Sequence, residues 1–405
     1  MTSTDRNPGQ VVRALAFTLT CFVLCLAQPL AAEEFTVNTT GDTGDGSLRQ
    51  EITDSNDGMD LVNTIIFDVD AIAADTEFPL TIGALPDIEQ TLTIDGTNPG
   101  GLEIVGDGTN LVTIKTNGRL TLKDVAFSAG EVLLESNAIL TFDVTGDPIE
   151  INGVIADAPL NTGGTLTKIG SGSLVLKGAN TFAGGVTISD GILEVSTDTV
   201  GSVSSIRTNA TLLFSQSTAG SYGGTILGTG SLEKDGTGTL TLNGANTYSG
   251  GTIVTAGTLM GNPGPIQGDI AIRSGATLEI VDATGSTMTG SISGAGTFVK
   301  SGAGTLVLDP TSGSNSWSEG QVMGGTLRED AAAISGNVNI IPLATLTMLG
   351  PPRIPASRFG GPIFSETPPA LAWAGPFVRV RALKRPSTTT SASIQIASPT
   401  PSDFA

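Results

Sequence analysis

Hydrophobic residues occur in short runs along most of the chain, and turn residues separate the runs. Examples are "TLTI" from Thr91, "LVTI" from Leu111 and "ILTFDV" from Ile139. Between the runs lie clusters such as "GDGTN" and "TNG", in which Gly and Asn adopt positive φ at little cost. Helical periodicity is nearly absent. The pattern therefore predicts an all-β chain of many short strands.

A longer period is also present. The segment Leu166 to Val195 recurs at Leu232 to Leu259, and a degenerate third copy begins at Phe298 after the same interval. We divide this interval into three turns of about 22 residues and predict that they stack as parallel strands in a solenoid. The copies share one lysine (Lys168, Lys234, Lys300), two glycines that follow it and two leucines after them (Leu174 and Leu176 in the first copy).

The stretch "GSLRQEI" predicts a short helix over residues 47–55. Ser47 and Gln50 have the spacing of a capping box, and Leu48 and Ile52 lie on one helical face. We expect this helix to cover the first coil, because an open end of a solenoid exposes unpaired strand groups.

Residues 1–32 are predicted to be an export signal. Arg6 and Arg13 precede an apolar run from Ala14 to Ala27, and small residues favour cleavage after Ala32. The alternative is an uncleaved anchor. Both cysteines, Cys21 and Cys25, lie in the apolar run, so the mature chain would contain no disulfide. No other stretch is apolar enough to cross a membrane as a helix.

The remaining chain divides into three parts. Residues 33–137 are predicted to form the N-terminal cap and the first coils, and residues 138–350 the repeat β-helix. Residues 351–405 are rich in Pro, Arg and Ser and no longer follow the repeat. This tail is either disordered and basic or translated out of frame. Its six basic residues are Arg353, Arg358, Arg379, Arg381, Lys384 and Arg385.

Composition narrows the possible chemistry. The net charge of −20 disfavours nucleic acid as a partner, because nucleic-acid binding depends on Lys and Arg. Histidine is absent, and both cysteines lie in the export signal. His-based triads, cysteine nucleophiles and zinc sites with those ligands are therefore not expected. We predict no cofactor and no metal.

Carboxylates are the remaining candidates for catalysis. One group lies between residues 54 and 70 and a second between residues 143 and 157, but no paired motif recurs, so solvated turn residues are the favoured interpretation and no catalytic residue is predicted. Asp42 and Asp45 in "GDTGDGS" suggest calcium, although a turn without metal is favoured. The two groups are Asp54, Asp57, Asp60, Asp68 and Asp70, and Asp143, Asp147, Glu150 and Asp157.

Three aromatic residues occupy equivalent places in the three copies: Phe182, Tyr248 and Trp317. They could form an exposed binding stripe. Packing in the core or against a turn, with one aromatic residue in each repeat, is the favoured interpretation.

The repeat resembles the autotransporter-associated β-strand repeat of bacterial surface proteins. The resemblance is carried by "KIGSGSLVLKGANTFAGGVTI", by "KDGTGTLTLNGANTYSGGTIV" and by the copy at Val299 to Leu327. "GDGSLRQEI" and "NTIIFD" resemble the opening of large secreted β-helix proteins. The resemblance implies a right-handed parallel β-helix that is exported by type V secretion in Gram-negative bacteria. No barrel strands follow Gly350, so we expect a separate or lost outer-membrane barrel.

The predicted function is that of an exported, non-enzymatic, adhesin-like stalk at the cell surface. Its expected partner is a host or neighbouring-cell surface protein or glycan, with no nucleic acid and no transmembrane helix in the mature chain. Two alternatives stay open. One is a carbohydrate-active β-helix enzyme that uses Asp and Glu, and the other is a truncated fragment without a function.

Overall fold

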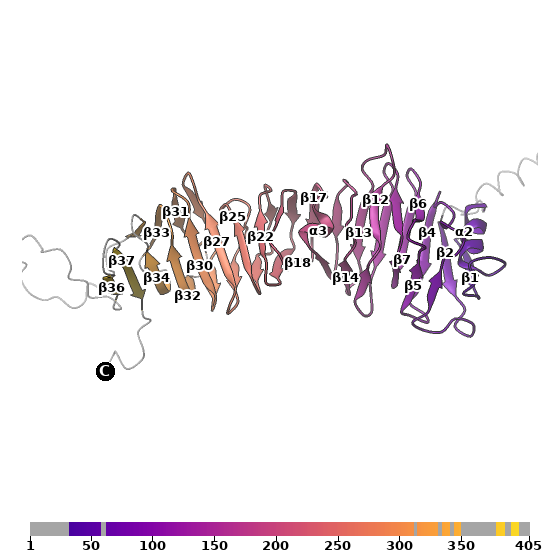
Figure 1. Ribbon diagram of the computed structural model, residues 1–405, viewed down its shortest axis with the longest axis horizontal. Helices are drawn as coiled ribbons and strands as arrows, with labels where there is room; N and C mark the ends of the chain where they lie inside the picture. The colour runs from indigo at the N-terminus through magenta and orange to yellow at the C-terminus, as the bar shows by residue number, and fades with distance from the viewer. Residues whose placement is uncertain are drawn as a thin grey trace, which may run out of the picture.

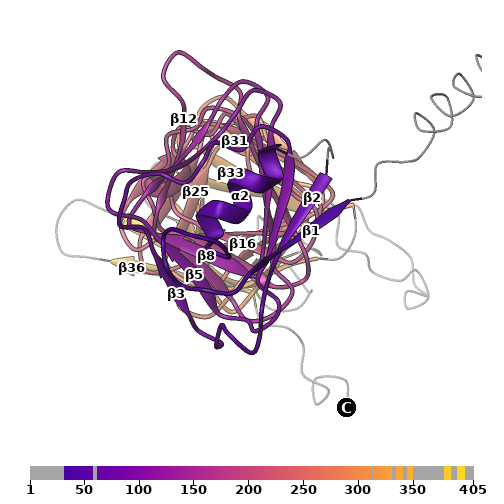
Figure 2. The ribbon, with the colours of Figure 1, turned by 90° about the vertical axis from the view of Figure 1, so that its right-hand side faces the viewer.

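The protein is a rod in which the chain coils along one long axis (Figure 1). The computed structural model describes residues 32–349 except 58–61, 312–313, 331–333 and 341–343, together with 378–384 and 390–396. Residues 1–31 of the expected export signal and Asp60 lie outside the described residues. Viewed end-on, the turns lie around a common axis and a helix crosses the N-terminal end (Figure 2).

Strands stack in parallel to form three long faces, apart from two antiparallel pairings at the C-terminal end. The first face consists of a ten-stranded sheet and, later in the chain, a four-stranded sheet (β28, β31, β33 and β35). The first-face strands are β1 (Glu33–Val37), β2 (Val62–Phe67), β4 (Thr91–Asp95), β7 (Arg119–Lys123), β10 (Ile139–Asp143), β13 (Thr165–Ile169), β15 (Val186–Ile188), β17 (Ser205–Thr208), β20 (Thr225–Gly228) and β23 (Thr247–Tyr248). The later strands are β28 (Ser286–Met288), β31 (Thr305–Leu308), β33 (Thr326–Asp330) and β35 (Thr345–Leu349).

The second face consists of a three-stranded sheet and an eight-stranded sheet, with β8 of the first lying beside β11 of the second. Its strands are β3 (Glu77–Pro79), β5 (Leu102–Val105), β8 (Val125–Ser128), β11 (Ile149–Ile151), β14 (Ser173–Leu176), β16 (Ile192–Val195), β18 (Thr211–Ser215), β21 (Ser231–Asp235), β24 (Thr252–Val254), β26 (Ile270–Ile272) and β29 (Ile292–Gly294).

The third face consists of a three-stranded sheet and, further along the chain, a nine-stranded sheet. Its strands are β6 (Asn110–Ile114), β9 (Glu131–Leu134), β12 (Val154–Asp157), β19 (Gly220–Tyr222), β22 (Thr239–Leu242), β25 (Thr258–Gly261), β27 (Thr277–Val281), β30 (Thr297–Ser301), β32 (Asn315–Val322), β34 (Ile334–Ile340), β37 (Thr390–Ile396) and β36 (Val378–Lys384). The predicted all-β class and parallel β-helix are confirmed.

Alternation along each strand builds the core. In β10, Leu140 and Phe142 are fully buried, whereas Thr141 between them faces outward. Because strands stack in register, like side chains form columns: Leu120, Leu140 and Leu166 are successive partners. The interior is therefore narrow, and aliphatic side chains fill most of it.

The sequence repeat is longer than three whole turns, so the predicted division into turns of about 22 residues is wrong. Leu166, Val186, Ile206 and Ile226 are successive partners on the first face. Three turns thus carry the chain from Leu166 only to Ile226, and the short stretch from there to Leu232 carries it to the next face. Consequently, the first repeat begins in β13 on the first face, the second in β21 on the second and the third in β30 on the third.

The predicted capping helix is present as α2 (Leu48–Asp57). The Ser47 hydroxyl accepts the Gln50 backbone N–H at 3.2 Å, but the Gln50 side chain donates to Asp54 at 2.7 Å, so only half of the capping box forms. Leu48 and Ile52 are buried against the first coil. The other helix in the described residues is the single turn α3 (Thr197–Val200). Neither helix is long and apolar enough to span a bilayer.

At the C-terminal end, β36 and β37 form a hairpin that pairs with β34. These two segments lie in the tail that we expected to be either disordered or out of frame. For these segments the structure differs from the expectation of disorder. The rest of residues 351–405 lies outside the described residues, and a change of reading frame stays a prediction.

Candidate functional site

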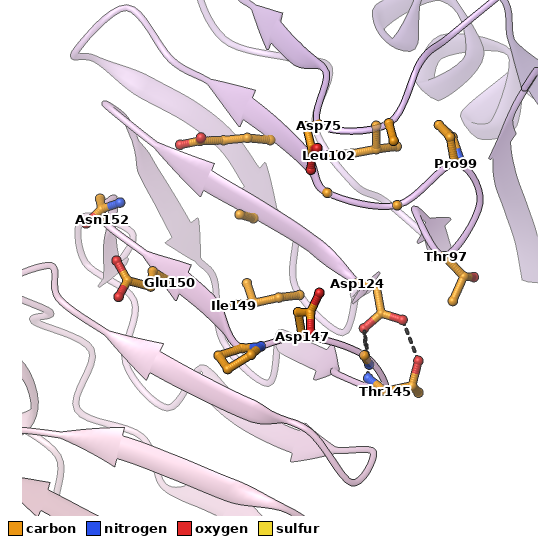
Figure 3. A pocket seen from close by; sticks show the side chains of 17 residues that line it. Asp75, Thr97, Pro99, Leu102, Asp124, Thr145, Asp147, Ile149, Glu150 and Asn152 are labelled. Atoms are coloured by element: carbon orange, nitrogen blue, oxygen red, sulfur yellow. Dashed lines mark hydrogen bonds between the residues drawn. The ribbon is translucent and has the colours of Figure 1, made fainter.

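A groove of about 670 Å³ lies where the first face turns into the second, between the turns of β4 and β10 (Figure 3). Its floor comes from β5, β8 and β11, and its rim comes from the loops that precede β3, β5 and β11. Five carboxylates line it: Asp75, Glu103, Asp124, Asp147 and Glu150.

Corners of different length create the groove. β7 ends at Lys123 and β8 begins at Val125, so Asp124 alone forms that corner, with φ at 49°. The corners on either side are longer loops, 96–101 and 144–148, and they project past it. Asp124 is fixed to the 144–148 loop, because its carboxylate accepts the Thr145 backbone N–H at 2.7 Å and the Thr145 hydroxyl at 2.5 Å.

The opposite rim depends on a close approach between Asp75 and Gly101. The Asp75 backbone N–H donates to the Gly100 carbonyl at 3.0 Å. A Cβ atom on Gly101 would lie 2.0 Å from the Asp75 Oδ1 atom, and the φ of Gly101 is +67°. Only glycine fits this position without displacing the Asp75 carboxylate.

The groove is strongly acidic. Neither Lys nor Arg is among its lining residues. The nearest ion pair joins Glu150 to Lys177 on the next turn at 2.6 Å, with both side chains about half exposed. Such a surface accepts hydrogen bonds from ammonium, guanidinium or hydroxyl groups and repels anionic ligands. An acidic polysaccharide would therefore meet uncompensated repulsion in this groove.

A separate ladder of charges runs along the first face. Asp95, Lys123 and Asp143 are successive partners, and the Lys123 Nζ atom lies 2.8 Å from Asp95. This hydrogen bond raises the pKa of Lys123. Partial burial raises the pKa of Asp143, and the nearby Asp124 carboxylate adds to the increase. Asp143 is not among the residues that line the groove, and it belongs to this ladder.

The structure brings together two of the predicted carboxylates, Asp147 and Glu150. Asp157 instead accepts the Ala183 backbone N–H at 2.9 Å. In the N-terminal group, Asp54 binds Gln50 within α2, and Asp68 accepts the Asp70 backbone N–H at 2.9 Å. Asp54 and Asp68 thus make local contacts, and no described member of the first group lines the groove.

Three of the five groove carboxylates were not predicted from the sequence: Asp75, Glu103 and Asp124. They come from three different turns, and none belongs to an acidic run. The correct turn length would have identified two of them, Glu103 and Asp124. These residues and Asp147 follow one another at intervals close to one turn of the coil.

The suspected calcium turn is held by other contacts. Asp42 forms an ion pair with Arg49 at 2.7 Å and accepts the backbone N–H groups of Thr81 and Ile82. Partial burial alone would raise its pKa, but these hydrogen bonds and the guanidinium hold the pKa below its ordinary value. Within the described part of the chain, no group of three or more acidic residues is arranged to hold a metal ion.

The repeated lysine is buried in every copy. Lys168, Lys234 and Lys300 are each 0% exposed. The Lys168 ammonium donates to the backbone carbonyls of Ile169 and Gly170 at 2.8 and 2.7 Å. It also donates to the backbone carbonyl of Asp190, on the next turn, at 3.3 Å. Lys234 and Lys300 make equivalent contacts. Each ammonium thus links two turns at a corner, and desolvation lowers the pKa of all three lysines.

A repeated asparagine has a similar role. The Asn180 side-chain oxygen accepts the Ile155 backbone N–H at 2.8 Å, and its amide donates to the Thr199 carbonyl at 3.0 Å. Asn246 makes the equivalent contacts to Ile226 and Pro265. Asn315, displaced by the insertion in the third copy, accepts the Ile292 backbone N–H at 2.7 Å.

The three repeated aromatic residues are also internal. Phe182, Tyr248 and Trp317 are 0%, 1% and 3% exposed. The core interpretation is confirmed, and an exposed aromatic stripe is excluded. Trp317 packs against Phe298 with ring centroids 4.8 Å apart.

Side chains that all three repeats share face inward, whereas many outward positions differ. Inward Leu174, Leu240 and Leu306 are identical and buried. The outward residue before each repeated lysine is Thr167 in the first copy, Glu233 in the second and Val299 in the third. The repetition therefore specifies the scaffold and leaves the surface free to vary.

Comparison with known proteins identifies the same three repeats. The profile of the Passenger-associated-transport-repeat matches residues 166–195, 232–260 and 298–328. The chain is 36% identical over 246 residues to the "Adhesin BmaC autotransporter" of Brucella suis biovar 1 (strain 1330), covering 50% of this chain. It spans 7% of the length of that relative. No solved structure matches significantly.

Proposed function

We propose that this chain, a repeat protein of the autotransporter passenger type, is a non-enzymatic adhesin-like stalk exported to the surface of a Gram-negative bacterium. The rod presents a binding face, and the acidic groove forms its N-terminal part. The partner is a protein or glycan on a host or neighbouring cell.

The main support for the proposal is the inward placement of the side chains that all three repeats share. Lys234, Asn246 and Tyr248 are buried, and each satisfies backbone groups or fills the core. Residues repeated for recognition would face solvent. A protein whose repetition serves only its rigidity is suited to holding a variable surface away from the cell.

The charge of the rod selects among partners. Residues 33–350 contain 36 acidic and 11 basic residues, and three of the basic residues are the buried lysines. Cationic protein surfaces and neutral glycans rich in hydroxyl groups suit such a surface, whereas sulfated or carboxylated glycans do not.

The relative named as an adhesin supports the stalk over the enzyme. The groove charge disfavours an enzyme that acts on acidic polysaccharides, because such enzymes need cations to neutralise the substrate carboxylates. No specific contact among the described residues favours the carbohydrate-active alternative.

A panel of immobilised cell-surface proteins and glycans tests the proposal with the intact rod. We expect binding to cationic proteins or neutral glycans, and at least a fivefold loss in the variant Glu103→Gln/Asp147→Asn. A matched control, Asp198→Asn/Glu279→Gln, removes the same charge outside the groove and should stay within twofold of wild type. Binding to no member of the panel would contradict the proposal, as would equal losses in both variants.

A further inference from the structure

The outer surface of the second face carries a periodic stripe that begins at the groove. Along the strands from β11 to β24, one column of outward residues alternates glutamate with an aliphatic side chain. In order of register, the column is Glu150, Val175, Glu194, Leu213, Glu233 and Ile253. We call these six residues the glutamate stripe. Glu103 and Ala126 are partners in the groove floor and show the same alternation.

Among the strands that the structure describes, no other face shows this alternation over a comparable length. On the first face the equivalent column runs from Glu34 through Thr64, Thr93, Thr121, Thr141, Thr167 and Thr187 to Arg207, and its six central residues are uncharged threonines. On the third face it is Thr241, Met260, Glu279 and Val299, with a single glutamate. The glutamate stripe is therefore a property of one face and not of the fold.

Glutamates in the stripe repeat every second turn. Neighbouring strands are about 4.8 Å apart, so successive glutamates are about 9.6 Å apart and the span from Glu150 to Glu233 is about 19 Å. A linear ligand that pairs with all three must carry a cation at the same interval.

Among regular backbone conformations, polyproline II fits this interval best. It rises about 3.1 Å per residue, so every third residue returns to the same edge after about 9.3 Å. An α-helix offers residues i and i+7 at about 10.5 Å, which accumulates a mismatch of about 2 Å over two periods. An extended strand returns to the same side every 6.6–6.8 Å or so, which does not match.

We propose that the glutamate stripe binds a basic polyproline II segment with Lys or Arg at every third residue. The cations pair with Glu150, Glu194 and Glu233, and proline rings between them pack against Val175, Leu213 and Ile253. This inference rests on the proposed function and names the partner class for its binding face.

Groups that already face these glutamates are few. Lys177 pairs with Glu150 at 2.6 Å, at the end of the stripe nearest the groove. The Thr255 hydroxyl donates to Glu233 at 2.7 Å, which leaves the charge of Glu233 uncompensated. The neighbouring outward column on the same strands is Ser173, Ile192, Thr211 and Ser231, and it carries no charge. Glu194 and Glu233 are therefore the two strongest positions for a ligand cation.

The test uses fluorescent peptides and the intact rod, with binding measured by anisotropy at low salt. One peptide has five Pro-Pro-Lys units. The second has five Pro-Pro-Pro-Lys units, with equal charge but a lysine spacing of about 12.4 Å. We expect the first peptide to bind at least tenfold more tightly than the second. Glu194→Gln/Glu233→Gln should weaken the first peptide about tenfold and the second about twofold or less.

Glu279→Gln provides a control at a comparable glutamate on another face. Glu279 faces outward on the third face and accepts a hydroxyl hydrogen bond from Ser301 at 2.7 Å, just as Glu233 does from Thr255. We expect this variant to bind the first peptide as wild type does. The inference would be overturned by equal affinity for the two peptides, by an equal loss in Glu279→Gln or by no binding. If the rod still binds the protein and glycan panel, only this inference fails. If it binds nothing there, the proposed function fails.

Discussion

The first coils and the repeats build the same β-helix by different means. In the described residues, every non-glycine residue with positive φ lies before the first repeat: Asp75, Asn117, Asp124, Ala129, Asn137 and Leu160. From residue 163 onward, the positive-φ positions of the described chain are glycines. The corners of the first coils are thus irregular and side-chain-bearing, whereas those of the repeats are uniform and bare.

Polar groups differ in the same way. Five ion pairs join residues between 42 and 177, most of them in the first coils and at the surface. The repeats place cations inside, on Lys168, Lys234 and Lys300. Irregular corners therefore create a groove, whereas regular corners with internal polar groups create a rigid stack with an even surface.

The largest expected effect comes from a bare corner. A Cβ atom on Gly238 would lie 2.0 Å from the Thr218 carbonyl oxygen, which belongs to the turn below. Gly238→Ala should therefore lower the free energy of unfolding by about 3 kcal/mol or more, because backbone must move. Gly223→Ala, where nothing lies within 4 Å, should change it by less than about 0.5 kcal/mol. Urea denaturation of both variants checks this, and equal midpoints would contradict it.

Next in size is the internal cation. Lys234→Met keeps the aliphatic stem but leaves the carbonyls of Asp235, Gly236 and Ala256 without their donor. We expect a loss of roughly 2–3 kcal/mol in the free energy of unfolding, since buried acceptors would lose their partners. Urea denaturation is again the measurement. An unchanged or raised midpoint would show that the lysine does not stabilise the corner.

A smaller effect follows from pH. Burial lowers the pKa of the three internal lysines below 10.5. Just below pH 10.5 the unfolded chain therefore binds more protons than the folded chain, so stability rises with pH in that window. Burial raises the pKa of Tyr222 and Tyr248 above 10.0, so their contribution is lost above pH 10.

Thermal unfolding at several pH values measures this balance. We expect the melting temperature to rise as the pH increases toward 10 and to fall again above about pH 10.5. In Lys234→Met the rise should be smaller, because one of the three groups is missing. A steady fall from pH 8 in the wild-type chain would contradict the assignment of lowered lysine pKa values.

The smallest effect concerns the surface. Lys177 pairs with Glu150, but both side chains are about half exposed. Lys177→Met should change the free energy of unfolding by less than about 0.5 kcal/mol, since exposed ion pairs contribute little. Comparison with Lys234→Met in the same urea series sharpens the contrast between outer and inner lysines. If Lys177→Met lowered the free energy of unfolding as much as Lys234→Met does, the outer and inner lysines would not differ and the prediction would be wrong.

Much of the fold could be predicted from the sequence, because a solenoid repeats its local pattern. Short alternating runs indicated strands, and the copies at Leu166 and Leu232 indicated stacking. The turn length could not be predicted correctly, because the interval between these copies divides evenly by three. Nothing in the amino-acid sequence indicates that the second copy begins on a different face from the first. Only the pairing of Leu166 with Val186 shows that one turn is shorter than a third of that interval.

The groove was harder to predict. Asp147 and Glu150 were recognised as candidates, but Asp75, Glu103 and Asp124 meet them only through stacking across turns. Their proximity depends on the short corner at Asp124 between two longer loops. Sequence distance gives no sign of such a hollow, because it is set by differences in corner length.

The most direct test of the stack measures two distances between spin labels, with Cys21 and Cys25 replaced by Ser. Thr187, Arg207, Leu227 and Thr247 are successive partners. Labels at Thr187 and Thr247, three turns apart, should therefore be separated by about 14 Å and show strong dipolar broadening. Labels at Thr187 and Ile253, one full sequence repeat apart, lie on different faces and should show weaker broadening. The reverse order would mean that each repeat closes three whole turns, and it would contradict the step of one face per repeat.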